Sequence, residues 1–444
     1  MNRRMIFIST VILLVGFGLW YGNARLPIIN GYASKMTCSC VFVADRLPES
    51  VTDQDLDFSL IRFATPTVDY EQKTVTSTVL GFGAQTAVYH KGTGCTLLID
   101  GQGPPEKKPT MRTSFDEANE PWPLGDLNVR SGIPSPQLTM AVQEAMVPEL
   151  KTRAIIVSRH NEILMEAYGD GFNENTPQLG WSMTKSITSA LVGILVGDGK
   201  LKIEDPAPVK AWQGDMRKRI ALRNLLQMNS GLKWVEDYSD ISLATKMLYM
   251  TADMGDYASA QKLVYPPDSV WYYSSGTTNI LSSIIKETIG DQQAYYEFAN
   301  KRLFEPCGMK SMVLEPDVSG TIVGSSYAFA TARDWTRFGL LYLNDGVFNG
   351  QRILPEGWVS FTRQEAKGAD GKYGAQWWLN LSKEELPDCP EDIYYCDGFQ
   401  GQRVYVVPSH DLVVVRLGIS NDFDYNGFMR RVLDAVPPKE TAVR

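Results

Sequence analysis

A serine and a lysine three residues apart could together carry out nucleophilic catalysis. Ser182 and Lys185 lie in the stretch WSMTKS, directly before the apolar run ITSALVGILVGDGKL. On a helix this spacing places both side chains on one face, so the amine can approach the hydroxyl. The same spacing is also ordinary at a helix start or on a solvated face. The sequence contains it three more times, at Ser230/Lys233, Ser259/Lys262 and Ser283/Lys286.

Sequence context separates the four pairs. Ser182 follows the turn-like PQLGW and opens a helix of small and apolar residues that should be buried. There the free backbone N–H of the serine could stabilise an oxyanion, and the helix N-terminus favours developing negative charge. Burial would also lower the pKa of Lys185. The other three serines lie in a turn, in a polar helical piece and inside an apolar helix, where these advantages are missing.

A serine nucleophile needs a base, and histidine is a poor candidate in this chain. The sequence has only three histidines, each in a polar turn: His90, His160 and His410. Gly-x-Ser-x-Gly, His-Glu-x-x-His and P-loop patterns are absent, and no cysteine spacing is typical of zinc, so we expect no metal and no cofactor. Lysine and tyrosine remain as bases. Tyr273, at the end of the aromatic run VWYY, is either a core aromatic or a phenol held partly ionised near a lysine.

The composition indicates a globular protein without a nucleic-acid partner. The chain has 444 residues, of which 44% are hydrophobic, and a formal net charge of -8. No long basic block is present to bind phosphates. The composition does not indicate an oligomeric state.

The N-terminus predicts export. Arg3 and Arg4 precede an almost uninterrupted apolar stretch from Met5 to Tyr21. It is either a signal peptide cleaved after Ala24 or a retained membrane anchor, and in both cases the positive charges place the rest of the chain outside the cytoplasm, in the periplasm or at the outer face of the inner membrane.

Six cysteines fit an oxidising compartment, where they can pair. Cys389 and Cys396 bracket the acidic segment CPEDIYYC and are the first choice for a disulfide. Cys38 or Cys40 with Cys95 is the second choice. Cys307 is expected to be a small buried apolar residue.

The pattern of elements predicts an α+β fold. We expect three parts: residues 1–25 as signal or anchor, 26–125 as an extension of short strands with a Pro-rich linker, and 130–440 as the main domain. The main domain begins with a helix capped by Ser135 and two strands joined at His160-Asn161. Mostly helical patterns follow, and strands return in YGAQWWLNL, QRVYVVP and LVVVRLG. Both ends of the domain should therefore form one antiparallel sheet, flanked by helices, around an inserted helical subdomain.

Three stretches in order, WSMTKS, YYSSGTTNIL and DGFQGQRVYVVP, resemble the serine β-lactamase and penicillin-binding protein superfamily. The resemblance is to its class C branch, and within it to nylon-oligomer (aminohexanoate-dimer) hydrolases and related esterases. It covers about residues 135 to 435 and implies a β-lactamase/transpeptidase-like fold.

The resemblance also implies roles for single residues. Ser182 would be the acylated nucleophile, Lys185 its partner in deprotonation, and Tyr273 the general base. Gly398 matches the glycine of the third motif, and the N–H groups of Ser182 and Phe399 would form the oxyanion hole.

Two departures from the family pattern bear on the substrate. Ser275 stands where the family has asparagine, and Cys396, followed by Asp397, stands where it has lysine or histidine. These changes weaken a penicillin-like interpretation. We expect Ser275, Asp397, Gly398 and Trp378 to contact the substrate, with the acidic segment before Gly398 favouring a cationic group.

The resulting hypothesis is an exported serine hydrolase that cleaves small amides or esters through an acyl-enzyme. The alternatives are a β-lactamase or D-alanyl peptidase, and a catalytically silent protein that binds or senses the cell wall.

Overall fold

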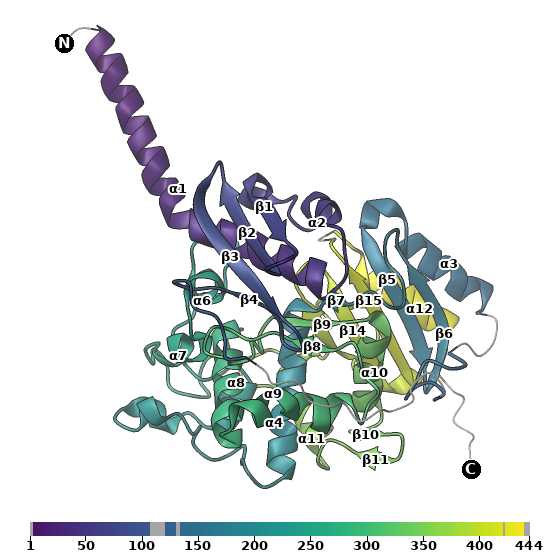
Figure 1. The fold of residues 1–444 in the computed structure, drawn as a ribbon. Coiled ribbons are helices and arrows are strands. Elements are labelled where there is room, and N and C mark those ends of the chain that lie inside the picture. Colours follow the sequence, from purple (N-terminus) through teal and green to yellow (C-terminus); the bar gives the residue numbers. More distant parts are fainter. Residues whose placement is uncertain (1–2, 107–119, 130–133, 421, 439–444) are drawn as a thin grey trace, which may run out of the picture.

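Two larger β-sheets, two small sheets and a helical region make up the described fold (Figure 1). The computed structural model describes residues 3–106, 120–129, 134–420 and 422–438, with the side chains of 3–21 and 23 outside that description. The predicted export segment, residues 5–21, therefore lies outside the described side chains. In the part of the chain that is described, no helix is both long and apolar enough to cross a membrane.

The larger sheet has six antiparallel strands, in the order β12-β13-β14-β15-β5-β6. The strands are β5 (Thr152–Arg159), β6 (Glu162–Tyr168), β12 (Trp378–Leu379), β13 (Tyr394–Gly398), β14 (Gln402–Val407) and β15 (Leu412–Gly418). Strand β15 pairs with β5, so the two ends of the domain meet in mid-sheet. The predicted antiparallel sheet is confirmed, and so is the turn at His160 between β5 and β6.

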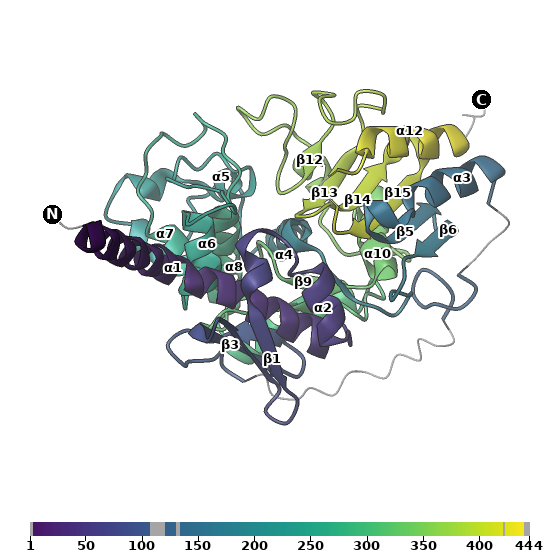
Figure 2. The ribbon, with the colours of Figure 1, turned by 90° about the horizontal axis from the view of Figure 1, so that it is seen from above.

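Helices cover both faces of this sheet (Figure 2). On one face α3 (Pro136–Ala145) packs against α12 (Tyr425–Ala435), and the Ser135 side chain caps α3 as expected. On the other face lie α10 (Ala332–Leu343) and α4 (Thr184–Gly197). Because both faces are covered, the central strands β14 and β15 are buried along their whole length, and each contains three valines.

The inserted region is mostly helical, as predicted. Its α-helices are α5 (Leu222–Leu226), α6 (Leu243–Met250), α7 (Met254–Ser259), α8 (Ser275–Ile289) and α9 (Gln292–Ala299). A small sheet, β7 (Gln178–Leu179), β9 (Ala328–Ala330) and β8 (Val313–Leu314), joins this region to the stretch before α4. The hairpin β10 (Val347–Phe348) and β11 (Gln351–Arg352) and helix α11 (Trp358–Thr362) complete it.

The N-terminal unit consists of a long helix and its own sheet. Helix α1 (Arg3–Phe42) packs along strands β1 (Thr65–Asp69), β2 (Thr74–Val79), β3 (Phe82–His90) and β4 (Gly94–Leu97). A short helix α2 (Pro48–Gln54) follows α1. Helix α1 runs through the boundary predicted at residue 25.

Cysteine pairing differs in part from the prediction. Cys38 on α1 and Cys95 on β4 form a disulfide, which confirms the second choice. The first choice is wrong, because Cys389 and Cys396 are both buried free thiols. Cys389 packs in the apolar cluster with α3 and α12, whereas Cys396 packs in the cluster with α4 and α10. The two thiols thus belong to opposite faces of the sheet. Cys307 is free and fully buried, as expected.

A second difference concerns the acidic segment before Gly398. Its acidic residues are typical of a loop, but residues Tyr394–Gly398 form strand β13. The sequence pattern did not predict this short strand because acidic residues precede Tyr394. The aromatic side chains of the strand are buried on both faces.

A buried ion pair fastens the N-terminal unit to the main domain. The ammonium of Lys35 on α1 pairs with the carboxylate of Glu315, and both side chains are almost completely buried. Ser39 and the backbone N–H of Cys95 donate to the same carboxylate, the former at 2.9 Å. The pair therefore ties α1 and β4 to the segment that follows β8.

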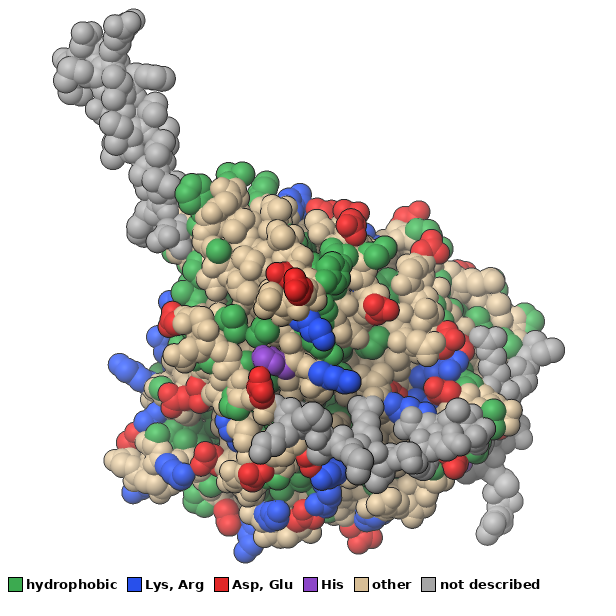
Figure 3. Space-filling model, in the orientation of Figure 1, with side chains coloured by type: hydrophobic (Ala, Val, Ile, Leu, Met, Phe, Trp, Pro, Cys, Tyr) green, Lys and Arg blue, Asp and Glu red, His purple; other side chains and the backbone are tan. Residues whose placement is uncertain are grey.

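On the face shown in Figure 3, acidic and basic side chains are interspersed.

The substitution Glu315→Gln should destabilise the fold by about 3–5 kcal/mol, because it leaves the Lys35 ammonium buried without its counter-charge. Urea unfolding followed by circular dichroism measures this. The matched control is Glu287→Gln, since Glu287 pairs with Lys210 at the exposed surface and should leave the midpoint almost unchanged. Equal midpoints for the two variants would contradict the role given to the buried pair.

Candidate active site

The backbone around Ser182 is held in an uncommon conformation. Ser182 lies in a single 3-10 turn, Trp181–Met183, that leads into α4. Trp181, the residue before it, has a φ of 48°, in the left-handed region that non-glycine residues rarely adopt. Its ring is fixed by Tyr32 and Phe399, at centroid distances of 5.9 and 5.6 Å. The surrounding rings thus maintain a strained turn that presents the Ser182 hydroxyl, a feature often found at functional sites.

Lys185 lies one turn deeper and is 1% exposed. Its Nζ is 3.0 Å from Ser182 Oγ, 3.0 Å from Ser275 Oγ and 2.9 Å from the carbonyl oxygen of Ser325. Burial lowers the pKa of Lys185 to about 8, although the nearby Glu236 carboxylate opposes this shift. Of the four Ser-x-x-Lys pairs, all within the described residues, this is the one whose side chains are hydrogen-bonded to each other.

Tyr273 meets the same pair from the loop before α8. The Lys185 ammonium lies 4.9 Å from the centroid of the Tyr273 ring. Burial raises the pKa of Tyr273, an effect that Glu236 reinforces and that the side-chain hydrogen bond with Ser182 partly offsets. The phenol is therefore neutral at ordinary pH. The expectation of a partly ionised phenol is wrong for this resting state, because the desolvation cost exceeds the stabilisation by neighbouring groups.

Two residues expected to contact the substrate lie next to Tyr273 and Lys185. Trp378 on β12 packs against the Tyr273 ring at 5.3 Å, while the neighbouring Trp377 is fully buried. Ser275, at the first position of α8, accepts a hydrogen bond from Lys185. Both residues therefore lie beside the reacting groups and hold them in place.

Sequence reasoning missed two residues of this network. Glu236 accepts hydrogen bonds from the hydroxyl and, at 2.9 Å, from the backbone N–H of Ser275. Tyr238 donates to Glu236 at 2.6 Å and lies 3.1 Å from Ser275 Oγ. The Trp234 indole donates to Glu236 as well. The sequence feature that could have indicated these residues is the period-two spacing of residues 234, 236 and 238. In an extended segment this spacing places the three side chains on one side.

Gly398 allows strand β13 to approach the turn that contains Ser182 closely. A Cβ at Gly398 would lie 2.1 Å from the carbonyl oxygen of Gly180. Phe399 follows directly, so its backbone N–H lies at the end of β13 beside this turn. The N–H of Ser182 is in the first turn of a helix, where N–H groups lack a partner within the helix. The two residues predicted to form the oxyanion hole, Ser182 and Phe399, thus lie on segments that contact each other.

The structure places Asp397 differently from the expectation. Its carboxylate forms an ion pair with Arg403, which also contacts Glu385 at 2.7 Å and stacks over the Tyr425 ring. Cys396 faces the opposite side of β13, where its thiol contacts Ser186. The Asp397 carboxylate is thus engaged in a structural ion pair, and the predicted contact with a cationic substrate group is not supported.

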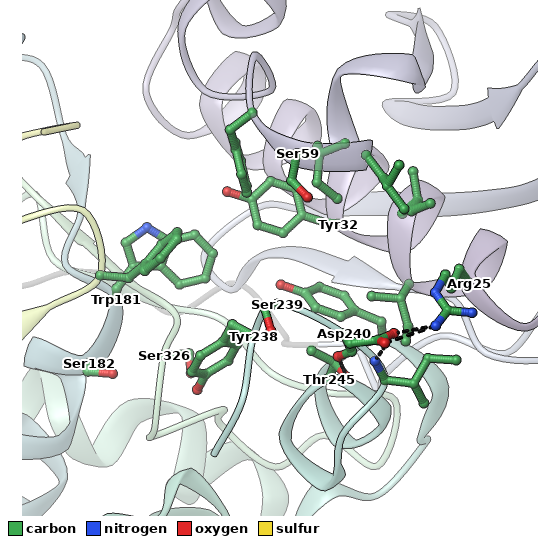
Figure 4. Close-up of a pocket in the computed structure, with 18 residues that line it drawn as sticks. Arg25, Tyr32, Ser59, Trp181, Ser182, Tyr238, Ser239, Asp240, Thr245 and Ser326 are labelled. Carbon is green, nitrogen blue, oxygen red and sulfur yellow. Dashed lines mark hydrogen bonds and ion pairs between the residues drawn. The ribbon is translucent and has the colours of Figure 1, made fainter. Parts of the chain in front are cut away.

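The site opens into a pocket of about 150 Å³ that Ser182 and Phe399 border (Figure 4). Among the described residues, no group of three or more His, Cys, Asp or Glu side chains is placed to hold a metal ion.

Comparison with known proteins agrees with this geometry. The family profile described as Beta-lactamase matches residues 142–435, which is most of the chain. The chain belongs to the beta-lactamase family. A curated relative, a 6-aminohexanoate-dimer hydrolase from Paenarthrobacter ureafaciens, is 25% identical over 314 residues, or 63% of this chain and 76% of the relative.

Solved structures share the fold. A putative 6-aminohexanoate-dimer hydrolase from Bacillus anthracis superposes with a TM-score of 0.58 and 23% identity over 70% of this chain and 90% of that one. A family VIII carboxylesterase superposes with a TM-score of 0.53 and 14% identity over 69% and 98% of the two chains. Together, the family match and the curated relative support one conclusion: this beta-lactamase-family protein is a serine hydrolase. The resemblance inferred from the sequence is confirmed.

Gly398→Ala should lower kcat for ester hydrolysis by about 100-fold or more, because the new methyl group would push β13 from Gly180 and displace the Phe399 N–H. Steady-state kinetics with circular dichroism as a folding check measures this. Gly214→Ala is the matched control, since nothing lies within 4 Å of its added Cβ. A folded Gly398→Ala enzyme with the activity of the control would rule out the proposed oxyanion hole.

Proposed function

We propose that this protein cleaves small amides or esters through an acyl-enzyme formed on Ser182. The observation that carries the proposal is the buried Lys185 amine, 3.0 Å from the Ser182 hydroxyl, with a pKa lowered to about 8. At that pKa an appreciable fraction of the amine is neutral near neutral pH, so it can accept the hydroxyl proton.

The reaction follows in two halves. The neutral Lys185 amine takes the Ser182 proton while Oγ attacks the substrate carbonyl, and the N–H groups of Ser182 and Phe399 stabilise the resulting oxyanion. The proton then passes through the Tyr273 phenol to the departing amine or alcohol. In the second half a water molecule gives one proton through the Tyr273 phenol to the neutral Lys185 amine while its oxygen attacks the acyl carbon. The bond between that carbon and Ser182 Oγ then breaks, the acid leaves, and the proton passes to Oγ, which restores Ser182.

Ser275, Glu236 and Tyr238 act as positioning residues in this mechanism. The Glu236 carboxylate fixes Ser275 through two hydrogen bonds, and Ser275 in turn contacts the Lys185 amine. The negative charge of Glu236 also limits how far burial lowers the pKa of Lys185. The network therefore sets both the position and the basicity of the amine.

Amides and esters are favoured over β-lactams by the third motif. A buried thiol, Cys396, occupies the position from which a cationic side chain would bind a substrate carboxylate in β-lactamases. The nearby Arg403 is already paired with Asp397 and Glu385. The relatives named as an aminohexanoate-dimer hydrolase and a carboxylesterase support the same substrate class.

We also propose that the protein is exported. Arg3, Arg4 and the apolar residues 5–21 motivate this part of the proposal, and the disulfide between Cys38 and Cys95 supports it, because disulfides persist in oxidising compartments.

A fluorophosphonate probe should label wild-type protein at Ser182, and Ser182→Ala should lose both labelling and ester turnover. Peptide mapping by mass spectrometry locates the label. Ser283→Ala, at another Ser-x-x-Lys pair, is the matched control and should retain both. Absence of labelling and turnover in folded wild-type protein would instead favour the catalytically silent alternative, and a label retained in Ser182→Ala would disprove the assignment of the nucleophile.

The rate constant kcat/KM for an uncharged ester should rise with pH and level off above a midpoint near pH 8, as Lys185 loses its proton. Well below the midpoint the rate should fall about tenfold per pH unit, because only the neutral amine accepts the Ser182 proton. Glu236→Gln should move the midpoint to lower pH, since the Glu236 charge raises the pKa of Lys185. A midpoint that does not move in Glu236→Gln would contradict the assignment of this titration to Lys185.

A further inference from the structure

The pocket beside Ser182 is built by two parts of the chain that lie far apart in sequence. One wall belongs to the region matched by the family and includes Trp181, Tyr249 and Phe399. The other wall comes from the N-terminal unit, which lies outside the matched residues. Its apolar lining residues are Ile28, Ile29 and Tyr32 on α1 and Phe58, Leu60 and Ile61 after α2.

Aromatic side chains of the two pocket walls pack against each other. The Tyr32 ring packs against Trp181 at 5.9 Å and against Phe58 at 5.4 Å, and the Phe58 ring lies 6.3 Å from Phe399. Figure 4 shows these walls around the space, with Ser182 at one side and Arg25 with Asp240 at the other. The N-terminal unit thus completes the cavity next to the nucleophile.

The N-terminal wall is held by contacts on both sides. The Lys35–Glu315 ion pair attaches α1 to the main domain, and the Cys38–Cys95 disulfide fixes α1 on its own sheet. The Asn30 amide donates to the backbone oxygens of Phe82 and Gly83 on β3, at 3.1 and 2.7 Å. A wall fixed by such contacts can discriminate between ligands by shape, because it does not have to order itself on binding.

The chemistry of the lining suits an uncharged apolar chain. The lining between Ser182 and the far end is dominated by aliphatic and aromatic side chains, and the charged pair at the far end, Arg25 and Asp240, is joined at 2.9 Å. A volume of about 150 Å³ accommodates a group of the size of benzene or a short alkyl chain.

The position of the proton donors indicates which part of the substrate enters. A departing amine or alcohol must receive a proton, so it has to lie beside Tyr273 and Lys185. Neither is among the described residues that line the pocket, whereas Ser182 and Phe399, which border the oxyanion position, both are. The pocket therefore extends from the carbonyl carbon on the side away from the leaving group.

We propose that the N-terminal unit forms an acyl-binding pocket that selects amides or esters of apolar aliphatic or aromatic carboxylic acids. The inference rests on the proposed function of Ser182 and adds the class of acyl group to it.

The test compares p-nitrophenyl esters from acetyl to octanoyl. Wild-type kcat/KM should increase with acyl length, and Ile28→Trp, which fills the pocket, should lower the octanoyl-to-acetyl ratio by about tenfold or more. Leu60→Trp fills the same pocket from a more exposed position and serves as a second variant in case the first does not fold. The matched control is Leu80→Trp, in the same unit but highly exposed on the turn between β2 and β3. It should keep the wild-type ratio.

A binding measurement separates the failure of this inference from the failure of the proposed function. Calorimetry on Ser182→Ala with N-octanoyl and N-acetyl anilides should show tighter binding of the octanoyl compound, and this preference should be lost when Ile28→Trp is added. Binding that follows acyl length without turnover in wild type would support the pocket and contradict the catalytic proposal. Turnover and binding that are independent of acyl length would overturn the acyl pocket.

Discussion

The burial of one amine is the constraint on which the rest of the site depends. Lys185 is at the start of a helix packed between the main sheet and the helical region, and a charge there is costly unless it has partners. Its three hydrogen-bond partners come from three separate segments: Ser182, Ser275 and Ser325. The same burial that makes these contacts necessary also lowers the pKa of Lys185, so the interaction that orders the site also makes it reactive.

Close packing brings the other groups of the site next to the Lys185 amine. Gly398 brings β13 against Gly180, and the Trp181 turn is fixed by rings from α1 and from the residue after β13. The site thus stands where the large sheet, the helical region and the N-terminal unit meet. The N-terminal unit is therefore part of the active-site architecture, although it lies outside the region that resembles the family.

The sequence could predict those site features that depend on local spacing. Ser182 and Lys185 could be found because a three-residue separation on a helix fixes their relative position, and the surrounding apolar run indicates burial. Glu236 could not be found in this way, since its role depends on an extended segment that meets α8 from a distance along the chain. The ion pair of Asp397 with Arg403 could not be found either, because it depends on which strand lies beside β13.

The sequence by itself determined the antiparallel sheet, the helical insertion and the hydrogen-bonded pair of Ser182 and Lys185, because periodicity and short-range spacing encode them. Tertiary structure decided which cysteines pair, whether the Tyr273 phenol ionises, and what borders the pocket beside Ser182. Each of these depends on distances and desolvation between segments separated by many residues. A pattern along one chain does not specify such quantities, since they arise only when the walls of the site are packed together.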